Sequence, residues 1–361
     1  MKNTKITTFQ YCIMAFFLLN SFIPLIGYHT LTKLNKTTSF LSILIGCLFI
    51  MMFIQLVKNI FSFQKNKTIL QKIEILFPKS KKLILLLCSM IMITVLLYSL
   101  NNLVVFINYY ILKDINLIMI TASLLLTILY CLNKSMDSIF RLTEIFFYIY
   151  IFIFLFSFLG MGKFINLYNV KPLLSSSLEN TILSSLLYFI SAIIPIFLLG
   201  IIPHSHINFT PDKTQQHILQ NAVKFSTLLI FINLLTIIST LGIQLANIYQ
   251  NPDMILYKKI SFLNILERIE TTIAFNNILN SFFFILMAIY VLKESIIKIF
   301  NIKKEKEIIS LSLIILILMI TSTLLTIPKN LYLISSVLIL IIMLTMSFKL
   351  FIGKYSQHET N

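Results

Sequence analysis

The chain is built from long runs of apolar residues separated by short polar or charged segments. A helix needs about 20 apolar residues to cross the hydrocarbon core of a bilayer. With this template the pattern predicts an all-α polytopic membrane protein, with ten transmembrane helices in a single domain, residues 1–361. Helices one to five occupy about 9–161 and helices six to ten about 181–351, followed by a polar tail at 354–361. Their approximate limits are 9–28, 39–57, 82–111, 115–132, 143–161, 181–203, 222–243, 270–292, 308–327 and 331–351.

Two of the predicted helices contain residues that interrupt a helix. Segment 20–27 of the first helix contains Pro24, and segment 191–200 of the sixth contains Pro195. Proline removes a backbone donor and clashes with the preceding turn, so both segments should kink or unwind. Freed backbone groups at bilayer depth are tolerated only inside the protein or beside a polar cavity. Breaks in the first and sixth helices fit a transporter of two five-helix halves, and simple packing kinks are the alternative.

Composition supports the membrane assignment. The chain is 58% hydrophobic and only 12% charged, and its mean hydropathy is +0.92. These values exclude a soluble protein and leave no room for a separate soluble domain. The net charge of +16 is better explained by lysines in loops on one side of the membrane than by a nucleic-acid partner.

The basic residues are unevenly divided between the two sets of loops. Most of the 29 lysines and arginines fall in the two termini and in the loops that follow even-numbered helices. Positively charged loops stay in the cytoplasm, so both termini are expected there. The even number of predicted helices agrees with this orientation.

Two loops contain amphipathic segments. In 65–82, apolar residues recur at helical spacing between lysines, which fits a short helix in the cytoplasmic interface; a plain basic linker is the alternative. Segment 251–268 begins with Asn251, Pro252 and Asp253 and continues as an amphipathic stretch. It fits a helix that caps the extracellular mouth.

Uncharged polar residues gather near the middle of the third and eighth predicted helices. Together with open backbone in helices one and six they would line a pocket near the membrane midplane. Such a pocket would hold an α-carboxylate by helix N-termini and an amide; ordinary hydrogen bonding between helices is the alternative. The predicted substrate-binding residues are Asn20, Ser21, Pro24, Tyr98, Asn101, Ser191, Ala192 and Asn277.

Charged residues lie near helix ends. Arg141 and Glu144 share one face at the start of helix five, and Glu267, Arg268 and Glu270 stand at the start of helix eight. They are interpreted as a gate or structural ion pairs, or as interfacial charges that reach toward water. The helix interiors carry no Asp, Glu, Lys or Arg, which disfavours a proton pump with a carboxylate relay.

No enzyme, metal or cofactor motif stands out. The histidines His204, His206 and His217 lie in one loop without acidic partners, which disfavours a metal site. The single cysteines Cys12, Cys47, Cys88 and Cys131 are typical of buried apolar positions. We therefore expect no catalytic residues, no metal site and no cofactor.

Several short motifs occur in an order that resembles one protein family, the endospore germination permeases, and within it the B subunit of GerA-type germinant receptors. The resemblance runs nearly end to end. The matching segments are Gln10 ahead of helix one, 67–69 opening the interfacial helix, Arg141 with Glu144, Pro203 after helix six, and 262–270 with Glu267, Arg268 and Glu270.

The resemblance implies a relation to amino acid/polyamine/organocation transporters and a LeuT-type 5+5 inverted repeat with broken helices one and six. It implies a sensor for a nutrient, often an amino acid, in the spore inner membrane. Its partners would be a membrane-embedded A subunit and a lipoprotein C subunit. Many family members carry glycine and an acidic residue in helix six, and segment 188–195 has neither.

Two other functions are weighed against a nutrient receptor. An amino-acid permease would transport its ligand without the A and C partners. A scaffold, or a polymerase or flippase of envelope polysaccharides, would need a long external loop, which the chain lacks.

Overall fold

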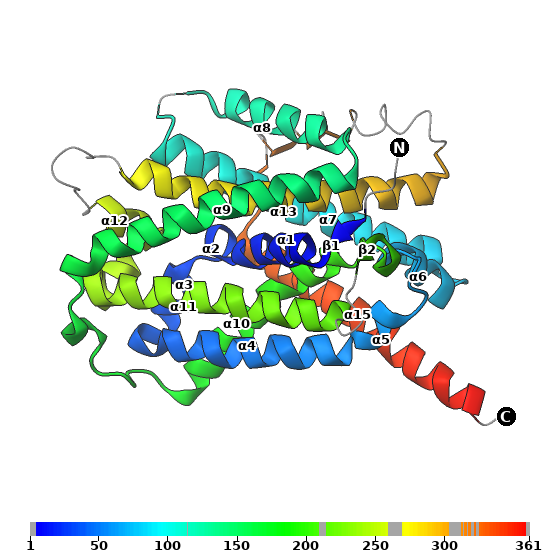
Figure 1. Cartoon of the computed structure of the whole chain (residues 1–361), viewed down its shortest axis with the longest axis horizontal. Coiled ribbons are helices and arrows are strands. Elements are labelled where there is room, and N and C mark those ends of the chain that lie inside the picture. Colours follow the sequence, from blue (N-terminus) through cyan, green and yellow to red (C-terminus); the bar gives the residue numbers. More distant parts are fainter. Residues whose placement is uncertain are drawn as a thin grey trace.

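The computed structural model describes residues 5–358, apart from 114, 209–213, 259–268, 303–311, 313, 316, 319–320 and 323–324. The described chain is almost entirely helical, and most of its long helices lie side by side along one axis of the molecule (Figure 1). Among the described residues, seven helical segments are long and apolar enough to cross a membrane. The elements used below are β1 (Ile6–Thr7), α1 (Thr8–Asn20), α2 (Phe22–Leu25), α3 (Tyr28–Asn35), α4 (Ser39–Leu56), α5 (Lys58–Ser62), α6 (Ile69–Leu76), α7 (Lys81–Tyr110), α8 (Leu117–Leu132), α9 (Met136–Met161), α10 (Leu178–Leu199), β2 (Ile207–Asn208), α11 (Gln215–Ile248), α12 (Pro252–Lys258), α13 (Ile269–Phe300) and α15 (Lys329–His358).

These helices match the hydrophobic pattern closely. Helices α4, α7, α8, α9, α10, α11, α13 and α15 overlap predicted helices two to eight and ten. Much of predicted helix nine, 308–327, lies outside the described residues. The all-helical membrane architecture is therefore confirmed, while the count of ten helices stays a prediction.

The first predicted helix is interrupted near its end. Helices α1 and α2 are separated only by Ser21, whose backbone keeps helical angles (φ −60°, ψ −13°). The real break is at Gly27, with φ 79° and ψ 156°, after which α3 begins. A positive φ is readily adopted only by glycine. The chain therefore leaves the helical path at the glycine, three residues after Pro24.

The predicted break in the sixth helix is wrong. Helix α10 runs without interruption through Pro195 to Leu199, and Gly200 is its C-cap. Every residue from 191 to 200 is buried, so packing on all sides keeps the helical path despite the backbone donor lost at proline. At the helix end, the backbone N–H of Ile69 in α6 donates to the carbonyl oxygen of Gly200 at 2.9 Å.

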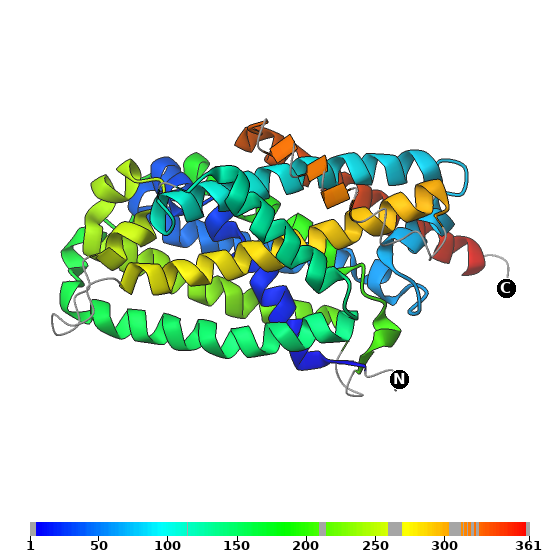
Figure 2. The same ribbon diagram turned by 90° about the horizontal axis from the view of Figure 1, so that it is seen from above.

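Both chain ends lie at the same end of the bundle (Figures 1 and 2). Strand β1 pairs in parallel with β2 through Ile6 and Ile207. The far end of α15 lies beside α6, where Lys349 donates to the carbonyl oxygen of Leu76. The short helix predicted within 65–82 is α6. We call the end of the bundle that holds β1, α6 and the end of α15 the basic end. Its position on the cytoplasmic side is a prediction from the charge of the loops.

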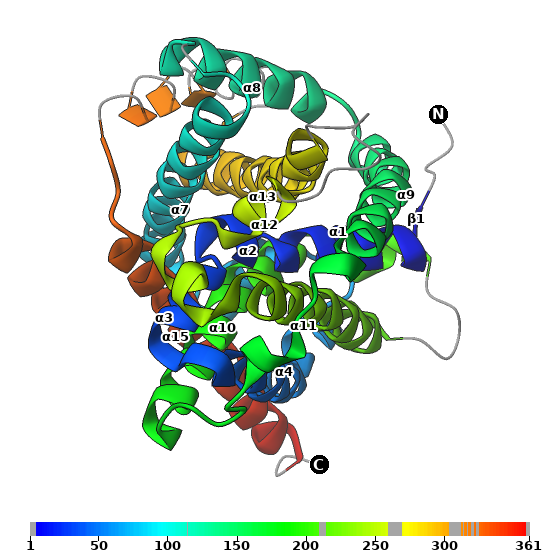
Figure 3. The same cartoon turned by 90° about the vertical axis from the view of Figure 1, so that its left-hand side faces the viewer.

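Helix α1 lies at the centre of the bundle. Figure 3, an end-on view, places α1 and α2 among α7, α9, α10, α11 and α13. All residues of α1 from Ile13 to Asn20 are buried, as expected for a helix that is apolar around its whole circumference. At its start, Gln10 closes a capping box with Thr7 and donates from Nε2 to Oε2 of Glu144 in α9 at 2.9 Å. The central helix is therefore anchored at the basic end.

Gly46 allows α4 and α10 to pack closely. A Cβ at this position would lie 2.7 Å from Cδ1 of Tyr188 and 2.9 Å from the carbonyl oxygen of Ser185. Close approach at small residues is a common way to pack membrane helices.

We expect Gly46→Ala to lower the free energy of unfolding by about 1–3 kcal/mol, because the methyl group forces the two helices apart. Gly162→Ala is the matched control, since nothing lies within 4 Å of its Cβ position. The measurement is thermal unfolding of the purified protein in detergent. Equal melting temperatures for the two variants would contradict the close contact.

Lys72 of α6 gives a second prediction. Its side chain is 4% exposed, and its Nζ donates to the carbonyl oxygens of Ile60 at 2.7 Å and Phe61 at 3.3 Å. Burial lowers the pKa of Lys72 to about 8, against about 10.4 in an unfolded chain. Between these values the unfolded state binds the extra proton, so stability rises with pH. We therefore expect the difference in melting temperature, wild type minus Lys72→Met, to increase between about pH 8 and 10. A constant or falling difference would refute this.

Candidate functional site

A polar pocket lies beside the break in the first helix. It has a volume of about 380 Å³ and is lined by residues from both sides of Gly27, from α7, from the end of α11 and the segment after it, and from the first turn of α15. Its lining residues are Ile23, Pro24, Leu25, Ile26, Gly27, His29, Thr30, Tyr98, Asn102, Ile248, Gln250, Asn251 and Lys329. We call it the break pocket.

Two side chains bind the carbonyl groups next to the break. The hydroxyl of Tyr98 donates to the carbonyl oxygen of Leu25 at 2.6 Å. Nζ of Lys329 donates to the carbonyl oxygen of Ile26 at 2.9 Å and also contacts Oγ1 of Thr30. A helix that ends inside a protein needs such partners for its last carbonyl groups. The break is therefore stabilised by α7 and α15.

Lys329 gives the break pocket a positive charge. The lining residues include no carboxylate, so an anionic group in the pocket would meet an ammonium group that has no acidic partner in that lining. Lys329 is also the first residue of α15, where the helix dipole disfavours a cation. The hydrophobic pattern places Lys329 in the loop between predicted helices nine and ten, so it was not among the predicted site residues. Its position just before a predicted helix, where a cation is unfavourable, is the sequence feature that could have indicated it.

The predicted substrate-binding residues separate into groups. Pro24 and Tyr98 line the break pocket, and Asn102 lines it in place of its neighbour Asn101. The side chains of Asn20 and Ser21 donate to carbonyl oxygens of their own helix, those of Phe16 at 2.9 Å and Leu18 at 2.6 Å. The last three lie away from the pocket lining, with Ser191 bonded to the carbonyl of Tyr188, Ala192 buried in α10, and Asn277 bonded to Asp253.

Asp253 is a buried acid that sequence reasoning placed in an external loop. It lies in α12, which packs against α11 and α13. Asp253 is 6% exposed, and its Oδ2 accepts a hydrogen bond from Nδ2 of Asn277 at 2.9 Å. Burial raises the pKa of the Asp253 carboxyl group. The rest of the predicted cap, 259–268, lies outside the described residues.

The other charged residues named from the sequence lie elsewhere. Glu144 accepts from Gln10, while Arg141 is exposed and is not among the ion-paired residues of the described chain. Glu267 and Arg268 lie outside the described residues, and Glu270 is described only as part of the first turn of α13.

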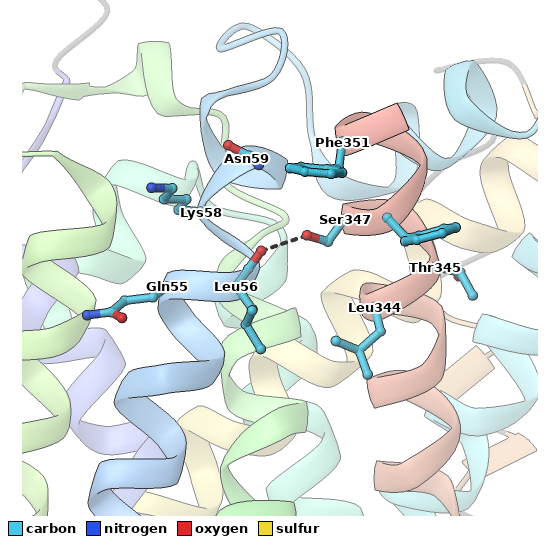
Figure 4. Close-up of a pocket in the computed structure, with 9 residues that line it drawn as sticks. Gln55, Leu56, Lys58, Asn59, Leu344, Thr345, Ser347 and Phe351 are labelled. Carbon is cyan, nitrogen blue, oxygen red and sulfur yellow. Dashed lines mark hydrogen bonds between the residues drawn. The ribbon is translucent and has the colours of Figure 1, made fainter. Parts of the chain in front are cut away.

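A larger groove lies on the side of the bundle between α4–α5 and α15 (Figure 4). Its volume is about 640 Å³, and Oγ of Ser347 donates across it to the carbonyl oxygen of Leu56 at 2.6 Å. Leu56 and Phe348 are 60% and 66% exposed, so its walls are typical of a lipid-facing surface. Lys58 also lines this groove, whereas in the break pocket the lysine itself donates to a carbonyl group beside the interruption of the central helix. Within the described part of the chain, no three His, Cys, Asp or Glu side chains come together as a metal site.

A bundle of apolar helices with an interrupted central helix and a polar pocket at the interruption is the architecture of a membrane transporter. The structure is similar to those of two mutants of the Eremococcus coleocola manganese transporter. Both have a TM-score of 0.55, with 14% and 13% identity, and cover 94% of this chain and 77% of that chain. The same transporter in complex with an aromatic bis-isothiourea substituted compound has a TM-score of 0.52 at 12% identity, covering 94% and 75%. This likeness is one of fold.

The sequence identifies the family within this class. A model of the spore permease family, described as spore germination protein, matches residues 5–331. The chain therefore belongs to this family, and the resemblance found in its motifs is confirmed at that level. No curated protein matches the chain significantly.

We expect Tyr98→Phe to lower the free energy of unfolding by about 1–3 kcal/mol, because it removes the donor to the buried Leu25 carbonyl group. Tyr130→Phe is the control, since Tyr130 is 64% exposed. Thermal unfolding of both purified variants measures the difference. Equal stability would mean that the Tyr98 hydroxyl does not hold the break.

Proposed function

We propose that the chain is the nutrient-sensing membrane subunit of a spore germinant receptor and that it binds an amino acid in the break pocket. The observation that carries this proposal is the position of Lys329, a cation without an acidic neighbour among the lining residues, beside carbonyl groups at a helix break. An α-carboxylate would pair with Lys329, and an α-ammonium group would bind the carbonyl oxygens of 25–27. A zwitterion therefore complements both features of the pocket.

Binding at this place would act directly on the first helix. A carboxylate that engages Lys329 competes with the Ile26 carbonyl group for the same ammonium group. Loss of that bond would leave the Ile26 carbonyl group with the Thr30 hydroxyl, which donates to it at 2.7 Å, and would detach the segment between α2 and α3 from α15. The proposed signal is this rearrangement, passed on to partner subunits.

The surrounding assembly is part of the same proposal. The partners are a membrane-embedded A subunit and a lipoprotein C subunit in the spore inner membrane, with both termini of this chain in the cytoplasm. We further propose ten transmembrane helices in a LeuT-type 5+5 arrangement, in which the first helix is broken and the sixth is continuous. The transporter fold supports the helix arrangement, and the family match supports a role in spore germination. The partner subunits follow from the motif resemblance alone, and the orientation follows from the charge of the loops.

A second candidate function is amino-acid transport, which the fold shared with a solved transporter favours. Although that neighbour is a manganese transporter, a pocket lined by a lysine and no carboxylate suits an organic anion or zwitterion better than a divalent cation. Concentrative uptake of an amino acid by the purified chain in vesicles would support the permease over the receptor.

We expect Lys329→Met to raise the nutrient concentration for half-maximal germination by about 10- to 100-fold, the value of one charge-assisted hydrogen bond. Lys329→Arg should restore part of the response, because it keeps the charge. The readout is potassium and dipicolinate release from spores that carry each allele in place of the deleted gene, tested over an amino-acid panel.

Lys163→Met is the matched control, since Lys163 is exposed. It should leave the dose response unchanged. A normal response of Lys329→Met spores at normal protein level would refute the assignment of the pocket. A deletion strain that still responds to every nutrient in the panel would refute the receptor role.

A further inference from the structure

A buried layer of polar side chains lies around Asp253 and is rich in acceptors. Asn276, Asn277 and Asn280 of α13 fall within a sector of roughly 100° on one face of the helix. Asn276 and Asn277 are each 7% exposed, and Asn280 is fully buried. The Oδ1 atoms of Asn276 and Asn280 and the Nδ2 atom of Asn280 find no hydrogen-bond partner in the protein, although Nδ2 of Asn276 donates to the carbonyl oxygen of Tyr150. Buried polar atoms without partners are rare in folded proteins.

Asp253 brings a carboxylate into this layer. It accepts a hydrogen bond from the Asn277 amide and faces the backbone N–H groups of Asp253 and Met254 in the first turn of α12. Among the described residues, the ionisable side chains close to it are the tyrosines Tyr28, Tyr110, Tyr150 and Tyr257, and no basic side chain pairs with it. The N–H donors lower the cost of the buried carboxylate but do not neutralise its charge.

The hydroxyl of Tyr28 lies near the Asn233 side chain without meeting it in hydrogen-bond geometry. Tyr28 is 1% exposed, lies directly after the break at Gly27, and is within electrostatic reach of Asp253. The Tyr150 hydroxyl lies near the Asn280 amide without meeting it in hydrogen-bond geometry. Tyr28 of α3, Tyr150 of α9 and the asparagines of α13 therefore lie close to one carboxylate from α12.

We propose that Asp253, with the amide oxygens of Asn276 and Asn280 and the hydroxyl oxygen of Tyr28, forms a binding site for a monovalent alkali cation. Hard cations take oxygen ligands, and one carboxylate among neutral oxygens balances one positive charge. Gln250 and Asn251, which line the break pocket, directly precede the start of α12. The cation would fasten α12 to α13 next to the break.

The test uses the purified full chain in detergent without nutrient, unfolded by heat in choline, sodium or potassium chloride at equal ionic strength. A ligand that binds only the folded state raises the melting temperature in a saturable way. We expect sodium or potassium to raise it by about 2–5 °C over choline. The same melting temperature in all three salts would overturn the proposal, since water or a proton would then fill the layer.

Variants locate the effect. Asp253→Asn should abolish the cation-specific shift, and Asn280→Leu should reduce it, whatever either does to the melting temperature in choline. Glu179→Gln removes an exposed acid in the first turn of α10 and should keep the full shift. A shift that survives in both Asp253→Asn and Asn280→Leu would place the cation elsewhere and overturn the site. Because no nutrient is present, the result does not depend on the proposed receptor function.

Discussion

The structure depends on how the backbone carbonyl groups at the break in the first helix find hydrogen-bond partners. Inside an apolar bundle, a carbonyl group without a hydrogen-bond partner destabilises the folded state, and apolar packing does not compensate for it. Here a tyrosine from α7 and a lysine from α15 donate to Leu25 and Ile26. Three segments far apart in sequence are thereby held at one point, and a polar pocket exists because they meet there.

The same arrangement links the two ends of the molecule. Helix α1 is buried from Ile13 to Asn20 and is anchored at the basic end by Gln10 and by the pairing of β1 with β2. The segment after its other end is held by polar contacts from Tyr98 and Lys329, which a ligand would replace under the proposed function. A rigid helix with one firm and one exchangeable attachment can carry a change in the pocket to the opposite end of the bundle.

The two prolines show why local sequence rules succeed at one site and fail at the other. Near Pro24 the break is made by Gly27, whose positive φ only glycine adopts without a steric penalty. Near Pro195 the same kind of signal predicted a break, yet α10 is continuous because packing on all sides holds it. Proline removes one hydrogen bond, and whether the helix then opens depends on the neighbours it packs against.

The sequence by itself determined the membrane class, most helix positions, the interruption in the first helix and the family, because these follow from apolar run length, backbone chemistry and short motifs. It placed Pro24 and Tyr98 among the ligand-binding candidates, and both line the pocket. Only the tertiary structure placed Lys329 in the pocket at the helix break and buried Asp253 against Asn277. Both lie between predicted helices, and a loop charge becomes part of a site only when chain packing buries it beside groups distant in sequence.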